Sequence, residues 1–198
     1  MLRLPMSEQL AWAKWWACPW LTAHHEWQML AFSTAPIALY RNHPGWLSAV
    51  LEVEPCLPCA PIPSLLQLML APTQQRDLML LLIECVCHAT GNERLSEHQR
   101  LWCQRLAKAL ARDLRLLSAE DPLHYLRAWV EPLVWQRLRL GFARQRVLEL
   151  EKHPRLHDSH GRLNTLWQAV IWRATSISGD GAHPPTGENA RHALPTQD

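Results

Sequence analysis

Glycine is scarce in this 198-residue chain, and so are the aromatic residues other than tryptophan: there are 7 Gly, 2 Phe and 2 Tyr. Strands favour Tyr and Phe, and tight hairpins need Gly, so this composition argues against a β architecture. The sequence also contains no Walker loop, no dinucleotide glycine fingerprint and no Gly-x-Ser-x-Gly elbow. The 11 Trp and the abundant Leu favour an α-helical core instead.

Long hydrophobic runs are missing as well. The longest strongly apolar run covers residues 78–83 and stops at Glu84, well short of the roughly 20 residues that span a bilayer. The first residues show neither the apolar stretch of a secretory signal nor the Arg-rich pattern of a transit peptide. We therefore expect a cytoplasmic protein whose six cysteines are reduced thiols, with no disulfide framework.

Helical periodicity and capping residues predict an all-α fold, a single compact multi-helix domain with a disordered C-terminal tail. Ser96 and Gln99 form a capping box that opens a helix to about residue 117, and Asp121 with Pro122 begins the next one. Six prolines between residues 44 and 72 restrict that stretch to two short helices at most. The expected segments are a Trp-rich helical part (1–43), a Pro-rich connector (44–72), a helical core (73–175) and the tail (176–198).

The net charge of +2 conceals an uneven distribution. Residues 1–93 carry 4 basic and 7 acidic side chains, whereas residues 94–173 carry 15 basic and 8 acidic ones. One basic stripe has helical spacing, and further arginines follow it. Such a stripe can bind an acidic protein surface, neutralise phosphates or be only a solvated face. The stripe residues are Arg105, Lys108, Arg112 and Arg115, and Arg137 and Arg139 are among the arginines that follow.

A protein partner is the favoured interpretation, because the net charge is low for a nucleic-acid-binding domain. Trp and Arg also dominate the energetics of protein interfaces. Trp15 and Trp20 are expected to be exposed, on the side of the N-terminal helix away from Trp12 and Trp16. The candidate partner-binding residues are therefore Trp15, Trp20, Arg105, Lys108, Arg112, Arg115, Arg137 and Arg139.

The sequence contains cysteines that could bind a metal ion, but their spacing does not match a known zinc-binding motif. Cys56-x-x-Cys59 and Cys85-x-Cys87 could supply four zinc ligands, but two helical residues two positions apart point about 200° away from each other. We expect no catalytic, cofactor-binding or metal-ligating residues, no cofactor and no enzymatic activity. Two alternatives stay open: a helical protein that binds nucleic acid through its basic face, and a small zinc or redox protein that uses the cysteine pairs.

Two stretches resemble a known family. Residues 15–27, Trp-Trp-Ala-Cys-Pro-Trp-Leu-Thr-Ala-His-His-Glu-Trp, resemble the N-terminal part of the SctK/YscK family of type III secretion proteins, where a Cys-Pro or similar pair precedes a His and a Leu/Trp-rich helix. Residues 135–143, Trp-Gln-Arg-Leu-Arg-Leu-Gly-Phe-Ala, resemble a segment nearer that family's C-terminal half. The Gly-poor middle and the polar tail depart from the family pattern.

The resemblance implies a non-enzymatic accessory subunit of the cytosolic sorting platform in a bacterial type III secretion system. Such a subunit joins the cytosolic domain of the inner-membrane ring protein to the pod protein of the platform. It takes no small-molecule substrate and does not insert into the membrane. Its location would be cytoplasmic, and peripheral to the inner membrane through its protein partners.

Overall fold

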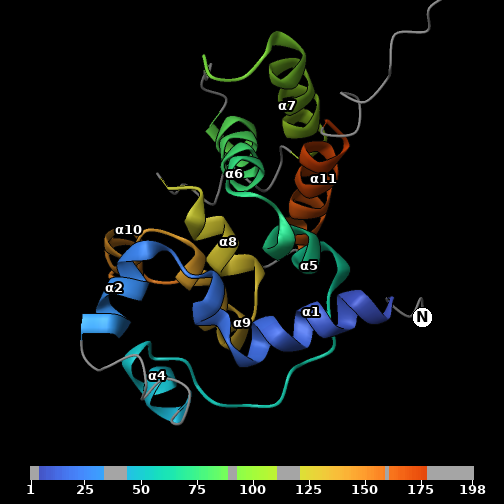
Figure 1. Ribbon diagram of the computed structural model, residues 1–198. Helices are drawn as coiled ribbons and strands as arrows, with labels where there is room; N and C mark the ends of the chain where they lie inside the picture. Colours follow the sequence, from blue (N-terminus) through green and yellow to red (C-terminus); the bar gives the residue numbers. More distant parts are fainter. Residues whose placement is uncertain (1–4, 34–43, 89–92, 111–120, 159–160, 178–198) are drawn as a thin grey trace, which may run out of the picture.

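The computed structural model describes residues 5–33, 44–88, 93–110, 121–158 and 161–177. Across these ranges the chain forms helices, without a strand, and the helices share one core (Figure 1). The prediction of a compact all-α domain is therefore confirmed. None of the described helices is both long and hydrophobic enough to pass through a lipid bilayer.

Helices occur in residues 1–43, 44–72 and 73–175 alike. The first segment contains α1 (Met6–Ala17), the 3-10 helix η1 (Pro19–Thr22) and α2 (His25–Ser33), and the Pro-rich connector contains the short helices α4 (Pro44–Val50) and α5 (Pro63–Leu70). The later elements are α6 (Thr73–His88), α7 (Glu97–Leu110), α8 (Leu123–Trp129), α9 (Pro132–Leu138), the 3-10 helix η3 (Arg139–Gly141), α10 (Arg144–Glu151) and α11 (Arg162–Ile177).

Local capping explains where several helices begin. The N–H of Gln99 donates to Ser96 Oγ at 3.2 Å, and the N–H of Ser96 donates to Gln99 Oε1 at 2.8 Å, which confirms the capping box. Asp121 Oδ1 accepts the N–H of Leu123 at 2.8 Å at the start of α8. Pro132 is the first residue of α9, so it separates α8 from α9 rather than kinking one long helix.

The core is centred on α6 and α11. Helix α6 packs on α7 and α11, and α11 also contacts α5 and α8. Met79, Leu82 and Trp167 are completely buried there. The connector belongs to the same fold, because its backbone runs along α1, where the indole N–H groups of Trp12 and Trp16 donate to its carbonyls.

The predicted helix that begins at Ser96 and the predicted C-terminal tail lie partly outside the residues that the structure describes. The capped helix is described to Leu110, so Arg112 and Arg115 lie outside the described residues, as does the rest of its predicted length to 117. Helix α11 continues to Ile177, two residues beyond the predicted end of the helical core at 175. The remainder of the predicted tail, residues 178–198, also lies outside the described residues.

Candidate functional site

The two segments that carry the family resemblance, 15–27 and 135–143, pack against each other. The backbone N–H of His24 donates to the carbonyl of Leu140 at 2.7 Å, and the indole N–H of Trp27 donates to the carbonyl of Phe142 at 2.9 Å. Over 100 residues of chain separate the partners in each pair. The two segments therefore form one structural unit in the folded protein.

Arg137 is the central side chain of this unit. It is only 3% exposed. Its Nε donates to the carbonyl of Trp16 at 3.1 Å, and its two Nη atoms donate to the carbonyls of Leu133 and Glu54 at 2.9 and 2.8 Å. One guanidinium thus ties together the end of α1, the connector and α9.

Arg139 lies two residues further on and is 4% exposed. Its Nη1 forms an ion pair with Glu151 at 2.8 Å, and its Nη2 contacts the carboxylate of Glu52 at 3.2 Å and the carbonyl of Leu51 at 2.9 Å. Glu151 also accepts the indole N–H of Trp135 at 2.7 Å. Charged groups are usually buried only with such partners.

The expectation that Arg137 and Arg139 face a partner is therefore wrong. Both guanidinium groups are directed into the protein, where connector residues 51–56 supply part of the acceptors and Trp16, Leu133 and Glu151 supply the others. Positions two apart on a helix point away from each other, so one of the two would normally reach solvent. Here the connector packs over the guanidinium groups, so that neither Arg137 nor Arg139 reaches solvent.

The expected exposure of Trp15 is also wrong. Trp15 is 7% exposed, and its ring centroid lies 5.3 Å from that of Trp12 and 6.2 Å from that of Trp16. The side of α1 that was expected to face solvent meets residues 69–73 at the junction of α5 and α6, which line a cavity together with Trp15. Trp20 is partly buried against the core.

Two large aliphatic side chains are exposed on α1 instead, among polar and small residues. Met6 is 79% exposed and Leu10 is 68% exposed. They lie four residues apart and therefore on one face of the helix. The sequence alone does not distinguish this pair, because apolar residues at helical spacing are usually buried in the core.

The first half of the basic stripe does lie at the surface. Arg105 and Lys108 are exposed on α7, and so is Leu101. Positions 101, 105 and 108 have the spacing of one helix face. Figure 1 shows α7 at one end of the molecule, packed on α6. The Leu101–Arg105–Lys108 face therefore combines an apolar side chain with two cations.

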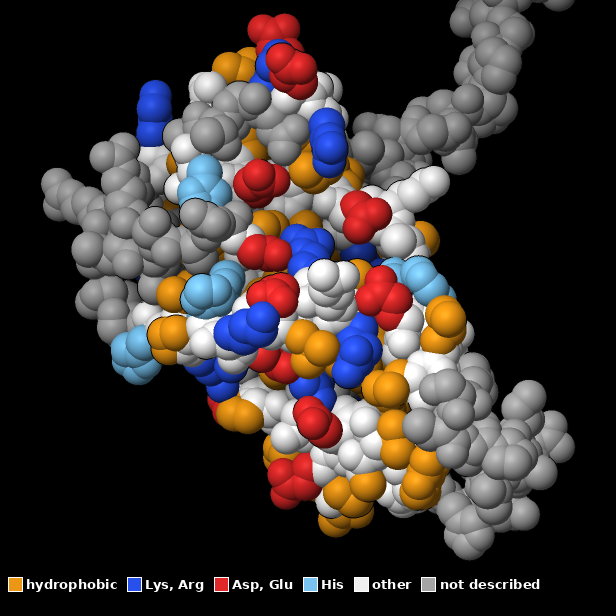
Figure 2. Space-filling model, turned by 90° about the vertical axis from the view of Figure 1, so that its left-hand side faces the viewer, with side chains coloured by type: hydrophobic (Ala, Val, Ile, Leu, Met, Phe, Trp, Pro, Cys, Tyr) orange, Lys and Arg blue, Asp and Glu red, His pale blue; other side chains and the backbone are white. Residues whose placement is uncertain are grey.

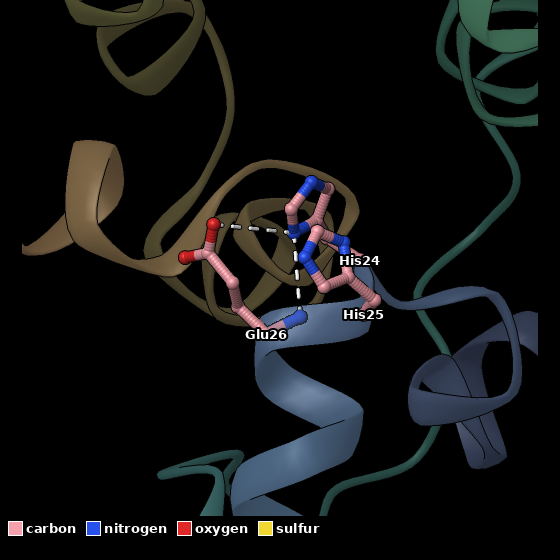
Figure 3. A group of neighbouring side chains, drawn as sticks. All are labelled: His24, His25 and Glu26. Carbon is pink, nitrogen blue, oxygen red and sulfur yellow. Dashed lines mark hydrogen bonds and ion pairs between the residues drawn. The ribbon is translucent and has the colours of Figure 1, made fainter.

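Among the residues that the structure describes, His24, His25 and Glu26 form a cluster that could hold a metal ion (Figure 3). One ligand atom from each of the three lies within 4.8 Å of the others. Two imidazoles and one carboxylate resemble the ligand set of a catalytic zinc site, which leaves a fourth position open. The four cysteines of the zinc or redox alternative do not converge in this way within the described part of the chain.

Helix capping accounts for the two partly buried members of this cluster. His24 Nδ1 accepts the N–H of Glu26 at 3.4 Å in the first turn of α2. Glu26 Oε2 accepts the N–H of Gln145 at 3.2 Å in the first turn of α10. Two helix N-termini thus meet at the cluster, and their positive dipole ends favour a carboxylate over a bound cation. We assign His24 and Glu26 to capping.

Comparison with known proteins identified no relative of this chain. No family model matches the chain, and neither a curated protein nor a solved structure is significantly similar to it. The packed pair of segments and the exposed faces of α1 and α7 are therefore the features on which a function can be proposed.

Proposed function

We propose that this protein is a non-enzymatic adaptor of a bacterial type III secretion system, linking the inner-membrane ring to the cytosolic sorting platform. The observation that supports this most is the packing of segment 15–27 on segment 135–143 through Arg137 and the Trp16 carbonyl. Both segments carry the resemblance to the SctK/YscK family. Their direct contact gives a physical reason for the two motifs to occur together, since each completes the other's hydrogen bonds.

An adaptor needs two separate surfaces, and the structure offers two of different character. The Leu101–Arg105–Lys108 face of α7 suits an acidic partner surface with an apolar centre. The α1 face formed by Met6 and Leu10 suits an apolar partner. Figure 1 shows α7 at the top of the molecule and α1 well apart from it in the lower part, so two partners could bind at once. The partners of this proposal are the ring protein's cytosolic domain and the pod protein, which would hold the adaptor at the inner membrane from the cytoplasmic side.

Nucleic-acid binding is less favoured by the distribution of charge. Burial removes Arg137 and Arg139 from the surface, and Arg146 and Lys152 are paired with Asp121 and Glu149. Figure 2 shows acidic and basic side chains intermixed over the face that contains α2 and α10. A phosphate-binding surface is instead a basic patch or stripe.

The proposal is tested by reversing the charges on α7. The variant Arg105→Glu/Lys108→Glu should bind the purified cytosolic domain of the ring protein, or the pod protein, at least about tenfold more weakly than the wild type, because complementary charges steer and orient association. A second variant, Met6→Ser/Leu10→Ser, should weaken binding to the other partner. Biolayer interferometry at two salt concentrations measures both effects.

Lys152→Glu, at the residue that follows α10, is the matched control, since it reverses one exposed charge outside both faces. All variants should keep the wild-type melting temperature, because surface substitutions usually change stability by about 0.5 kcal/mol or less. Unchanged binding of both partners by the two face variants would contradict the proposal. Steeply salt-dependent binding of the wild type to random DNA, with neither protein bound, would favour the nucleic-acid alternative.

A further inference from the structure

A cavity of about 290 Å³ lies between η1, the junction of α5 and α6, and the end of α9. Most of its wall is apolar, formed by side chains that include Trp15, Met69, Leu70 and Leu138. Its size is just below that of common small-molecule sites, so it accommodates a short group rather than a large ligand.

Two arginines, Arg76 and Arg137, also line this cavity, and none of the lining residues that the structure describes is Asp or Glu. The donors of Arg137 already bind backbone carbonyls, which leave its positive charge unneutralised. The cavity therefore has an apolar wall and a positive charge excess. This combination favours an anionic group attached to an apolar one.

Arg76 is the cation that is available to a ligand. Its Nη2 donates to Thr73 Oγ1 at 3.3 Å, its Nε is buried without a hydrogen-bond partner, and it forms no ion pair with the described residues. Burial lowers the pKa of Arg76, while the nearby Asp77 opposes this shift. A partly buried guanidinium with unused donors is stabilised by an anion that accepts from it.

Gly141 shows how closely the guanidinium is held against the cavity wall. A Cβ atom at position 141 would lie 2.8 Å from Arg76 Nη1. Only a residue without a side chain leaves room for the guanidinium in its present place. The backbone of η3, which also belongs to the packed pair of segments, therefore lies close to the guanidinium and limits the space open to it.

We propose that this cavity binds a carboxylate carried on a short apolar group, with the carboxylate at Arg76 and the apolar part against Trp15, Met69 and Leu138. The planar guanidinium matches a carboxylate in geometry and charge. Two sources share this chemistry: the C-terminal apolar residue of a polypeptide, and a free short-chain carboxylic acid. The inference does not depend on the proposed adaptor function.

Titration of the full chain with simple probes tests this site. Acetyl-Gly-Leu with a free C-terminus represents the polypeptide source, hexanoate represents the free acid, and acetyl-Gly-Leu-amide is the neutral control. Either or both carboxylates should shift the Trp15 indole signal in a ¹H–¹⁵N spectrum and bind at least about tenfold more tightly than the amide. The tighter carboxylate identifies the source.

Two variants assign the binding to Arg76. Arg76→Gln should reduce carboxylate affinity by about tenfold or more and abolish the preference over the amide. Gly141→Ala keeps the charge but displaces the guanidinium, so it should also weaken binding. Lys152→Gln removes an exposed charge just after α10 and should bind like the wild type.

Melting curves show whether each variant is folded. If Arg76→Gln does not fold, the affinity of Gly141→Ala for the carboxylates tests the proposal. Equal affinity for the carboxylates and the amide would overturn the proposal. So would the absence of binding by either carboxylate at millimolar concentration. Full affinity in both folded variants would overturn it as well.

Discussion

The guanidinium of Arg137 lies 4.1 Å from the centroid of the Trp16 ring, and its Nε also donates to the Trp16 carbonyl. The contact joins residues that are 121 positions apart. The cation is attracted by the face of the indole, and this attraction is strengthened by burial. The pair fixes the N-terminal segment to the second half of the chain, so it should contribute strongly to stability.

The variant Arg137→Met should lower the free energy of unfolding by about 3 kcal/mol. Methionine fills much of the same space but leaves the carbonyls of Trp16, Leu133 and Glu54 without their donor. Urea unfolding monitored by tryptophan fluorescence measures the change. Arg137→Lys should recover only part of it, because an ammonium group cannot reproduce the guanidinium's planar arrangement of donors.

Arg105→Met is the control, because Arg105 is exposed on α7. It should change the free energy of unfolding by about 0.5 kcal/mol or less. Equal effects of the two substitutions would show that the Arg137 contacts contribute little to the fold.

The capping box at the start of α7 gives a second prediction. Ser96→Ala removes the acceptor of the Gln99 N–H and should lower the free energy of unfolding by about 1 kcal/mol. Ser96→Thr retains a hydroxyl acceptor, so it should lower the free energy of unfolding by about 0.3 kcal/mol at most. Urea unfolding curves of the three proteins measure the difference. A Ser96→Ala variant as stable as the wild type would mean that the first turn of α7 needs no cap.

The sequence allows prediction of the features that depend on neighbouring residues. Ser96 with Gln99 and Asp121 with Pro122 mark helix starts because cap and helix lie within a few positions of each other. The all-α fold and the short helices of the Pro-rich connector follow from the same local signals.

Burial of the arginines could not be predicted in this way. Arg137 and Arg139 each have acceptors in the connector, more than 80 positions away, and most of these are backbone carbonyls, which every sequence contains. The burial of Trp15 also involves residues distant in the chain, since it lines a cavity together with residues 69–73 of the α5–α6 junction. The partner of Glu26, the Gln145 N–H, is likewise distant and carries no sequence signal.

The ion pair between Asp121 and Arg146 leads to a prediction about pH. Burial raises the pKa of Asp121, but hydrogen bonds from the Arg146 side chain and the Leu123 N–H outweigh it, and the net pKa lies below the ordinary value of 3.8. The unfolded chain therefore takes up this proton at higher pH than the folded protein. The contribution to stability is full above pH 3.8 and is lost as the pH falls below that value toward the folded-state pKa.

The variant Asp121→Asn isolates this contribution. Its deficit in free energy of unfolding relative to the wild type should be largest at pH 7 and should shrink below pH 3.8. Urea unfolding at a series of pH values between 7 and about 2.5 measures the deficit. Glu149→Gln, which breaks an exposed pair with Lys152, should have a deficit of at most about 1 kcal/mol at pH 7. A deficit for Asp121→Asn that stays constant across the series would contradict the assigned pKa direction.

The cysteines should differ sharply in reactivity, because only the thiolate form is nucleophilic. Burial raises the pKa of Cys87 and of Cys103 to about 12. Desolvation also raises the pKa of Cys59, but its side chain is exposed and therefore accessible to reagents. Iodoacetamide at pH 8 should therefore alkylate Cys59 in the native protein and leave Cys87 and Cys103 unmodified, as peptide mass spectrometry would show. In urea all three should react at similar rates, which provides the control. Native labelling of Cys87 or Cys103 as fast as Cys59 would show that α6 and α7 open readily and would return the redox alternative to consideration.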